Sequence, residues 1–368
     1  MLVNKTIAVV VPAYNEAQQI GKVIETMPEF VDRIVVVNDA STDNTAQVVK
    51  QYIKQHEHQV GPNITQNSSP VQATPYNQAE IIVQQINSRE ARYFTPAQVV
   101  NGHPDHERII LINHLHNAGV GAAIATGYKW CKDHQIDCTA VMAGDGQMDP
   151  DELESICRPV LEEGIDYVKG NRLIHRSAWF VIPKIRYFGN SFLSILTKIA
   201  SGYWHVSDTQ TGYTAISKKA LNALRIHKIY KRYGMPNDML VKLNIAFCTL
   251  KEVEIKPVYQ NEAQQSKMKI WKVIPSISWL LLRSFFKRLW VKYLFRDFHP
   301  LFLLYHFAFF LFLLNIPYVV KIVKVAILAG QPLNPVTLLV FMLLFISGFQ
   351  SLLFAMWMDI QDNERLYK

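Results

Sequence analysis

Cysteine is scarce in this chain of 368 residues. Its four cysteines, Cys131, Cys138, Cys157 and Cys248, have spacings that fit neither a zinc site nor a disulfide framework. We therefore expect reduced thiols, as in a cytosolic protein. A signal peptide is also missing, because residues 6–12 form a short strand-like run that leads directly into a turn. Both absences favour a globular part that stays in the cytoplasm.

Charged residues make up only 18% of the chain, and two long runs near the C-terminus have none at their centres. Residues 299–320 and 335–357 are each long enough to cross about 30 Å of hydrocarbon. The segment between them carries lysines, a glycine and a proline, so we expect a transmembrane hairpin with both ends on one side. A buried core hairpin of a soluble protein is the alternative, but no domain is left to cover it. Two spans without internal charge also argue against a transporter.

The net charge of +8 suits nucleic acid or an anionic membrane surface. The apolar runs favour the membrane, and no nucleic-acid partner is expected. Basic residues before the first run outnumber those in the turn, which places the globular part on the cytoplasmic side. Residues 270–298 mix tryptophan, leucine and phenylalanine with arginine and lysine, a composition typical of amphipathic helices in the headgroup layer.

The chain divides into four parts on this basis. They are the globular domain at 1–262, amphipathic juxtamembrane helices at 263–298, the transmembrane hairpin at 299–360 and a cytoplasmic tail at 361–368. Within the globular part, residues 55–107 are rich in Gln, Asn, Pro, Ser and His and show little periodicity. We expect this insertion to be disordered or a mobile flap, with at most a weak helix around residues 77–87.

The rest of the globular part alternates apolar runs with helix-like segments. Continuous apolar runs at residues 7–11, 34–37, 109–112 and 139–142 suit strands that are buried on both faces. Helix-like segments accompany them at about 16–27, 43–56, 119–134 and 150–163. This alternation predicts an α/β fold with a doubly wound, mostly parallel sheet. Ligands of such sheets bind beyond the carboxyl ends of the strands.

Two of these strand ends carry polar residues suited to ligand binding. After the first strand, a Pro-Ala-Tyr-Asn-Glu segment leaves backbone amides and the carboxylate of Glu16 at the mouth of the sheet. Asp39 follows the second strand and can accept hydrogen bonds from a base or a ribose, although turn chemistry alone also places Asp at such positions. Asp43 is expected mainly to cap the next helix.

The end of the fourth strand carries a candidate metal site. Asp145 follows this strand, and the side-chain carbonyl of Gln147 can reach the same divalent cation from a second point. Oxygen ligands of this kind suit Mg²⁺ or Mn²⁺, with diphosphate oxygens and water completing the shell. Asp149 precedes Pro150, which predicts that Asp149 caps the following helix.

Basic residues follow in two clusters, at 169–172 and 183–190. Arg172, Lys184 and Arg186 are expected after a strand and on the next helix, where cations can neutralise a diphosphate and an incoming lipid phosphate. Arg186 and Asn190 are four residues apart and share one helix face. Charge that only faces lipid is the alternative, and for Lys184 the two interpretations are balanced.

Taken together, these segments resemble glycosyltransferase family 2, and in particular the branch of dolichol-phosphate mannosyltransferase and the bacterial polyprenyl-phosphate glycosyltransferases. The resemblance covers roughly residues 5–260 apart from the insertion, and the hairpin matches the membrane-anchored members. It implies a GT-A type, Rossmann-like fold. It also implies nucleotide binding by Pro12, Ala13, Tyr14, Glu16, Asp39, Gly121 and Asp145. Gly121 lies in a glycine-containing stretch that lets the backbone approach a ligand or a packing neighbour.

The sequence departs from the family at the metal site. Members usually carry an Asp-X-Asp motif there, but Ala143 stands where the first Asp would be, which leaves Asp145 and Gln147. On the acceptor side, the resemblance implies contacts with the lipid phosphate or the sugar for Arg172, Lys184, Arg186, Asn190, Asp208, Gln210 and Asp238. For Asp238, a helix cap is the alternative.

The reaction that the resemblance implies is a single inverting displacement. An oxygen of polyprenyl phosphate attacks the anomeric carbon of a UDP- or GDP-linked sugar, and the nucleoside diphosphate leaves. The attacking phosphate is already anionic, so Asp145, Arg172 and Arg186 would act by positioning and charge stabilisation. The implied partners are the nucleotide sugar, the lipid phosphate, the bilayer and other copies of the chain in a homo-oligomer. The sugar, the nucleotide and the length of the lipid are left open.

Two alternatives stay open. A family-2 transferase with a saccharide or another lipid as acceptor would need a carboxylate base and usually a Gln-X-X-Arg-Trp segment, which this sequence lacks. A non-catalytic membrane scaffold that keeps the fold is suggested by Ala143. The presence of Asp39, Asp145, Gln147 and Arg172 argues against that scaffold.

Overall fold

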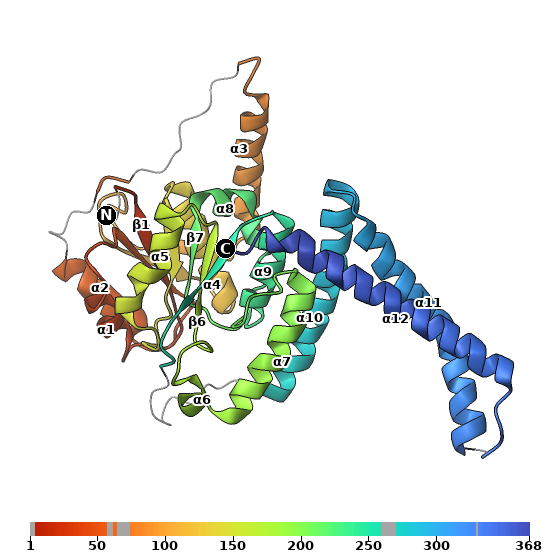
Figure 1. The fold of residues 1–368 in the computed structure, drawn as a ribbon. Helices are drawn as coiled ribbons and strands as arrows, with labels where there is room; N and C mark the ends of the chain where they lie inside the picture. Colours follow the sequence, from red (N-terminus) through yellow and green to blue (C-terminus); the bar gives the residue numbers. More distant parts are fainter. Residues whose placement is uncertain (1–3, 57–61, 65–73, 259–269, 329) are drawn as a thin grey trace.

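The computed structural model describes residues 4–56, 62–64, 74–258, 270–328 and 330–368 (Figure 1). Its centre is a mixed sheet to which the described residues contribute eight strands, in the order β3-β4-β2-β1-β5-β7-β6-β8. These strands are β1 (Ile7–Ala13), β2 (Arg33–Asn38), β3 (Ala97–Val99), β4 (Ile109–His114), β5 (Cys138–Val141), β6 (Tyr167–Asn171), β7 (Thr214–Ser217) and β8 (Leu250–Glu254). The α/β fold expected from the sequence is confirmed.

The four strands predicted from apolar runs form the parallel half of the sheet. β4, β2, β1 and β5 lie side by side and run in one direction. Their residues are almost entirely buried, as continuous Val and Ile runs require. β7 and β3 are antiparallel to their neighbours, whereas β6 and β8 are parallel to each other. The sheet is therefore parallel at its centre and mixed at both sides.

Helices cover both faces of this sheet. Side chains from alternate residues of β1, such as Ala8 and Val10, pack under α4 (Val120–Asp133), α8 (Lys218–Ala223) and α9 (Met235–Ile245). The intervening residues, such as Val9 and Val11, pack under α1 (Ile20–Glu25), α2 (Thr45–Gln55) and α5 (Leu153–Glu162). This division follows from the two-residue period of a strand. As predicted, Asp149 caps the short helix η2 (Pro150–Glu152) by accepting from the amide of Asp151 at 3.1 Å.

The insertion contains more structure than the sequence suggested. The expected helix is present as α3 (Gln78–Glu90), which buries none of its residues and continues into η1 (Ala91–Tyr93). β3 then pairs antiparallel with the edge of β4, with Val99 opposite Ile112. The sequence did not predict β3, which forms because the exposed edge of β4 offers it backbone partners. Residues 57–61 and 65–73 of the insertion lie outside the described part of the chain.

The C-terminal helices extend away from the sheet (Figure 1). α6 (Ala178–Val181) precedes α7 (Lys184–Ser201), which packs beside α10 (Ile270–Trp290), and the π-helical turn η5 (Val291–Arg296) follows α10. α11 (Pro300–Ile322) with η6 (Val323–Leu328) and α12 (Pro335–Glu364) form the predicted hairpin. In their most apolar stretches only 22% and 11% of residues are buried. The hairpin is therefore no core of a soluble domain and is suited to a membrane.

The end of the chain packs against the globular domain. α12 continues to Glu364, beyond the predicted end of the second span. The following residues then join the sheet next to β8, where the amide of Leu250 donates to the carbonyl of Leu366 at 2.7 Å. The amide of Lys368 donates to the carbonyl of Leu250 at 2.9 Å. The tail therefore belongs to the globular domain, because its backbone satisfies part of the edge of β8.

Candidate active site

A cavity of about 510 Å³ opens at the carboxyl ends of β1, β2 and β5. Parallel strands end at the same edge of a sheet, and this edge is where the sequence placed the ligand site. The residues that line the cavity include Pro12, Ala13, Tyr14, Glu16, Asp39, Asn117, Gly119, Ala143, Asp145, Arg232 and Tyr233. All residues expected to bind the nucleotide thus line one cavity, with the exception of Gly121. Tyr14 is 46% exposed at its rim, so its ring is accessible to a base.

The two loops after β1 and β2 hold each other in place. Thr45 Oγ1 accepts from the amide of Glu16 at 2.9 Å, and Asp43 accepts from the amide of Ala17 at 3.1 Å. Asp43 also accepts from the amide of Thr45, the first residue of α2, at 3.0 Å, although Asn44 and not Asp43 occupies the N-cap position. The backbone of the Pro-Ala-Tyr-Asn-Glu segment is thereby fixed before any ligand arrives.

Asp39 is 2% exposed, and its carboxylate is already engaged within the protein. His114 Nδ1 lies 2.7 Å from Oδ1, and the amides of Ala118 and Gly119 donate to the two oxygens at 2.9 and 2.7 Å. Burial alone would raise the pKa of Asp39, but these hydrogen bonds outweigh burial and hold the pKa below its usual value. Asp39 therefore shapes the backbone of residues 117–119 around the cavity, in addition to any contact with a base or ribose.

The N-terminus of α4 is occupied by another loop of the chain. The carbonyl of Lys231 accepts from the amides of Gly121 and Ala122 at 2.9 and 3.2 Å. Gly121 is therefore covered by residues 230–231 and does not line the cavity, whereas Gly119 does. The structure favours a packing role for Gly121 over the expected contact with the nucleotide.

Asp145 lies where the main cavity meets a smaller one of about 70 Å³, which Gln147 and Arg172 also line. The amide of Gln147 donates to Asp145 Oδ1 at 3.0 Å. Among the described residues, no Lys, Arg or His forms an ion pair with Asp145. Burial raises the pKa of Asp145, against the hydrogen bond from the Gln147 amide. This site has a carboxylate that a cation would stabilise.

The residues at this position fit a divalent cation that the substrate helps to bind. Within the described part of the chain, no three His, Cys, Asp or Glu side chains converge as a complete metal site. Mg²⁺ commonly takes one or two protein carboxylates and completes its shell with phosphate oxygens and water. Asp145 and Gln147 supply that kind of incomplete oxygen set, in agreement with Ala143 at the neighbouring position.

Arg172 lines the smaller cavity and is held by Asp208. Nε and Nη2 of Arg172 donate to the two carboxylate oxygens of Asp208 at 2.8 and 3.1 Å. Asp208 is 1% exposed and also accepts from the amides of Gln210 and Thr211 at 3.2 Å. Burial by itself would raise the pKa of Asp208, but Arg172 holds the pKa below its usual range. We infer that Asp208 orients Arg172, which leaves its expected contact with the sugar without support.

The other acceptor-side residues are spread over three elements. Lys184 lies at the start of α7, where its ammonium donates to the carbonyl of Trp179 at 2.6 Å and lies 3.2 Å from the centroid of the Trp179 ring. Asn190 lies on the same helix. The backbone of Arg186 is also in α7, but its side chain lies outside the described part of the structure. The structure thus places these three on one helix, which begins twelve residues after Arg172.

Gln210 and Asp238 are held by residues of α9 and of the loop before it. Gln210 Nε2 donates to Asn237 Oδ1 at 2.9 Å, and Gln210 lines a cavity of about 150 Å³ beside the main one. Asp238 is buried and accepts from the amide of Tyr230 at 2.7 Å and from the ammonium of Lys242. Asp238 thereby fixes the loop that covers α4, so the structure favours a supporting role for Asp238 over a contact with the acceptor.

The family model described as glycosyl transferase family 2 matches residues 8–65 and 62–225, more than half of the chain. The chain belongs to glycosyl transferase family 2. A UDP-N-acetylglucosamine–dolichyl-phosphate N-acetylglucosaminyltransferase of Methanococcus voltae is 28% identical over 264 residues, which are 70% of this chain and 88% of that protein. A dolichyl-phosphate beta-glucosyltransferase of Trichomonas vaginalis is 25% identical over 71% of this chain and 65% of that protein.

Solved structures with a similar arrangement include glucosyl-3-phosphoglycerate synthase of Mycobacterium tuberculosis. Its complex with Mn²⁺, UDP and glucosyl-3-phosphoglycerate has a TM-score of 0.45 and 15% sequence identity, over 77% of this chain and 80% of that chain. A complex of the same enzyme with Mg²⁺ and UDP has a TM-score of 0.44 and 16% identity, over 77% of this chain and 79% of that chain.

Four residues around this family 2 site were missed or left without a role by the sequence. Arg232 and Tyr233 line the main cavity from the loop before α9, and no motif marks them. Lys169 is fully buried and donates to the carbonyl of Thr211, and burial lowers its pKa to about 8. Glu252 on β8 accepts from the amides of Ser207 and Asp208. Of these four residues, only Lys169 belongs to a group that stands out in the sequence, the basic cluster at 169–172.

Proposed function

We propose that the chain transfers a sugar from a nucleoside diphosphate to the phosphate of a membrane polyprenyl lipid, with inversion at the anomeric carbon. One observation carries the proposal. Asp145 borders both the large cavity suited to a nucleotide and the small cavity that contains Arg172. A diphosphate bound beside Asp145 would therefore lie between a cation site and a guanidinium. The family 2 relatives named as dolichyl-phosphate transferases supply the class of acceptor.

Helix α7, which follows Arg172 in the chain, supports an acceptor that arrives from the bilayer. Leu193 and Ala200 of α7 share one apolar core with residues of α10, α11 and α12. On its outer side, α7 exposes Phe188, Phe192 and Ile195, which are spaced as one face of a helix. A stripe of large apolar side chains on a helix that shares a core with the hairpin suits the headgroup layer of a membrane. A lipid phosphate in that layer could reach the site along α7.

In this proposal the protein contributes position and charge. The fixed loops after β1 and β2 hold the nucleotide, with Tyr14 at the base and Asp39 behind the 117–119 backbone. Arg172, kept in one orientation by Asp208, stabilises phosphate charge at the small cavity. Lys184, Arg186 and Asn190 of α7 then lie on the side from which the lipid phosphate approaches. A phosphate nucleophile is anionic at neutral pH, so these roles require no general base.

A divalent cation, Mg²⁺ or Mn²⁺, would be held by Asp145 and Gln147 and would stabilise negative charge on the departing diphosphate. The burial of Asp145 without a described counter-ion supports this assignment. With the hairpin in the cytoplasmic membrane and its two ends on one side, we place the catalytic domain in the cytoplasm. A homo-oligomer stays a prediction.

The full-length chain in lipid nanodiscs tests the proposal. UDP-glucose, UDP-N-acetylglucosamine, UDP-galactose and GDP-mannose are each offered with a short polyprenyl phosphate and Mn²⁺, and the lipid product is identified by mass spectrometry. We expect one donor to give a polyprenyl-phosphate monosaccharide. Arg172→Ala should lower kcat by about a hundredfold. The exposed Arg158→Ala, in α5 and outside the lining of both cavities, should leave kcat unchanged.

Two results would favour the alternatives. A product formed only when a saccharide is supplied would assign a different acceptor to the same donor site. Binding of nucleotide with no transfer to any acceptor would point to a scaffold.

A further inference from the structure

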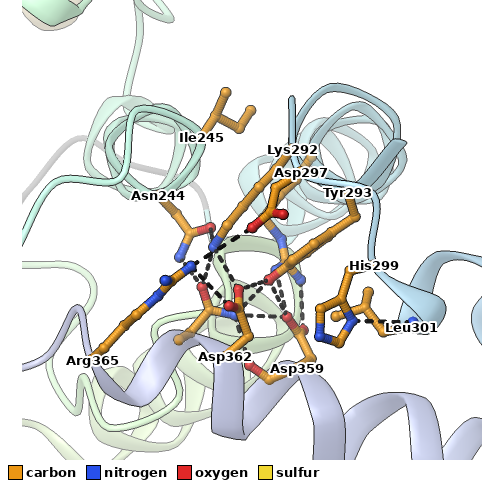
Figure 2. Close-up of polar contacts among 12 residues, drawn as sticks. Asn244, Ile245, Lys292, Tyr293, Asp297, His299, Leu301, Asp359, Asp362 and Arg365 are labelled. Atoms are coloured by element: carbon orange, nitrogen blue, oxygen red, sulfur yellow. Dashed lines mark hydrogen bonds and ion pairs between the residues drawn. The ribbon is translucent and has the colours of Figure 1, made fainter. Parts of the chain in front are cut away.

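The end of α12 is locked onto the helices that precede the hairpin (Figure 2). Arg288 of α10 donates through Nη1 and Nη2 to the two oxygens of Asp359, each at 2.7 Å. Lys292 of η5 donates to Asn363 at 2.6 Å and to Asn244 of α9 at 3.1 Å. Because these side chains are almost fully buried, the direction in which the chain leaves α12 is fixed.

The residues after α12 are directed into the globular domain by this cluster. Leu366 is 5% exposed and belongs to the core beneath α4 and α9. Its carbonyl and the amide of Lys368 pair with Leu250 at the start of β8. The segment therefore continues the sheet by one bridge and presents the side chain between them, Tyr367, to the neighbouring loop.

Tyr367 lies near two residues that lead toward the active site, His205 and Glu252. Its ring lies 5.4 Å, between centroids, from the ring of His205. Burial raises the pKa of Tyr367, and the nearby carboxylate of Glu252 raises it further. Glu252 is two residues along β8 from the bridge and faces the loop that contains His205.

Glu252 in turn holds the backbone that supports Arg172. Its two oxygens accept from the amide of Ser207 at 3.1 and 3.0 Å, and one of them also accepts from the amide of Asp208 at 3.1 Å. Asp208 then binds the guanidinium of Arg172 through both carboxylate oxygens. Lys169 lies in the same cluster and favours the ionised forms of Asp208 and Glu252. A continuous set of contacts thus runs from the tail to Arg172.

We propose that Tyr367 and Glu252 are positioning residues for Arg172, so that the segment following the membrane hairpin sets the geometry of the phosphate site. The idea rests on the role proposed for Arg172. A site residue is held in place only if the groups behind it are themselves fixed. Here those groups are a buried carboxylate, a strand edge and a tail that is anchored by the Arg288–Asp359 pair. The orientation of the Arg172 guanidinium therefore depends on how the end of the hairpin packs against the globular domain.

Kinetics of Tyr367→Phe and Glu252→Gln in the full-length chain provide the first test. We expect kcat for transfer to a short polyprenyl phosphate to fall about tenfold, because small displacements of a charged group weaken catalysis strongly. KM for the nucleotide sugar should change by less than about twofold, since neither residue lines the main cavity. Tyr76→Phe, an almost fully exposed tyrosine near α3, serves as the matched control.

A double-mutant cycle separates positioning from general loss of structure. In an Arg172→Ala background, Tyr367→Phe should lower the remaining activity by less than about twofold, because the residue that it positions is gone. A tenfold loss in both backgrounds would overturn the proposal, and so would wild-type kcat in both single variants.

A third measurement does not depend on activity. Hydrogen–deuterium exchange of residues 203–213 should accelerate in Tyr367→Phe and Glu252→Gln and stay unchanged in Tyr76→Phe, because the amides of Ser207 and Asp208 lose their fixed acceptor. Unchanged exchange would refute the positioning role even if transfer is observed. Faster exchange in a protein that transfers no sugar to polyprenyl phosphate would instead count against the proposed function alone.

Discussion

A Cβ atom on Gly121 would lie 2.0 Å from the carbonyl oxygen of Tyr230. No side chain fits at this distance, so α4 and the 230–231 loop can meet only because residue 121 is glycine. The same loop continues to Arg232 and Tyr233, which line the main cavity. The glycine therefore serves the site through packing of the loop that closes it.

Gly121→Ala is expected to lower the free energy of unfolding by about 1–3 kcal/mol, the usual cost of overpacking. Affinity for UDP or GDP should also fall, since the loop must move away from α4. Thermal unfolding and isothermal titration would measure the two effects. Gly102→Ala is the matched control, because a Cβ there meets no atom within 4 Å. Equal stability of the two variants would contradict this account.

Asp145→Asn should separate metal binding from stability. The carboxylate is largely buried without a described counter-ion, so removing its charge should leave the metal-free melting temperature unchanged or raise it. Mn²⁺ with UDP should raise the melting temperature of the wild-type chain but not that of the variant, because a ligand stabilises only the state that binds it. A wild-type Mn²⁺ shift in Asp145→Asn would place the cation elsewhere.

Asp359→Ala would leave the guanidinium of Arg288 buried without its carboxylate. Loss of one partner of such a pair typically costs about 3–5 kcal/mol. Replacing both residues with apolar ones, as in Arg288→Met with Asp359→Leu, should recover much of that loss. Unfolding in detergent would be compared with Asp297→Ala, which removes an exposed partner 3.9 Å from Arg365 and should cost less than about 1 kcal/mol. A double variant as unstable as the single one would argue against the pairing.

Lys169 makes the free energy of unfolding of the domain depend on pH in the alkaline range. Burial lowers its pKa to about 8, although Asp208 and Glu252 oppose the shift. Above that pH the unfolded chain holds a proton that the folded chain has released, so the free energy of unfolding should rise as the pH increases from about 8 toward the ordinary lysine value. The full gain is about 3 kcal/mol.

The rise should be absent in Lys169→Met, whose side chain does not titrate. The difference in unfolding free energy between wild type and variant would be measured at pH 7, 8, 9 and 10. The wild-type chain should gain relative to the variant across this range. Parallel curves would show that Lys169 does not change its protonation on unfolding.

The order of these elements along the chain allowed much of the fold to be predicted. Strands buried on both faces need continuous apolar residues, which is why β1, β2, β4 and β5 were recognised. The length and apolar character of residues 299–320 and 335–357 predicted the hairpin for the same reason, since backbone in hydrocarbon must be helical. Asp145 and the loops after β1 and β2 were found because the ends of parallel strands share one edge.

The roles of individual side chains depended on partners far away in the sequence. His114, Ala118 and Gly119 take up the carboxylate of Asp39 from about eighty residues away, and Asp208 takes up Arg172. No local pattern predicts such pairs. Many polar residues are equally common in loops, and their partners are determined only when the fold brings distant segments together.

The sequence by itself therefore determined the kind of protein: an α/β domain of glycosyl transferase family 2 followed by a hairpin of two helices long and apolar enough to cross a membrane. Periodicity and length impose those features locally. Only the tertiary structure decided that Gly121 packs under a loop, that Asp208 faces Arg172 and that the segment after α12 returns to β8. Each of these contacts joins residues that are far apart in the sequence and buried in the fold. A polar group that loses its contact with water needs a hydrogen-bond partner, but its own sequence neighbourhood does not specify which residue supplies that partner.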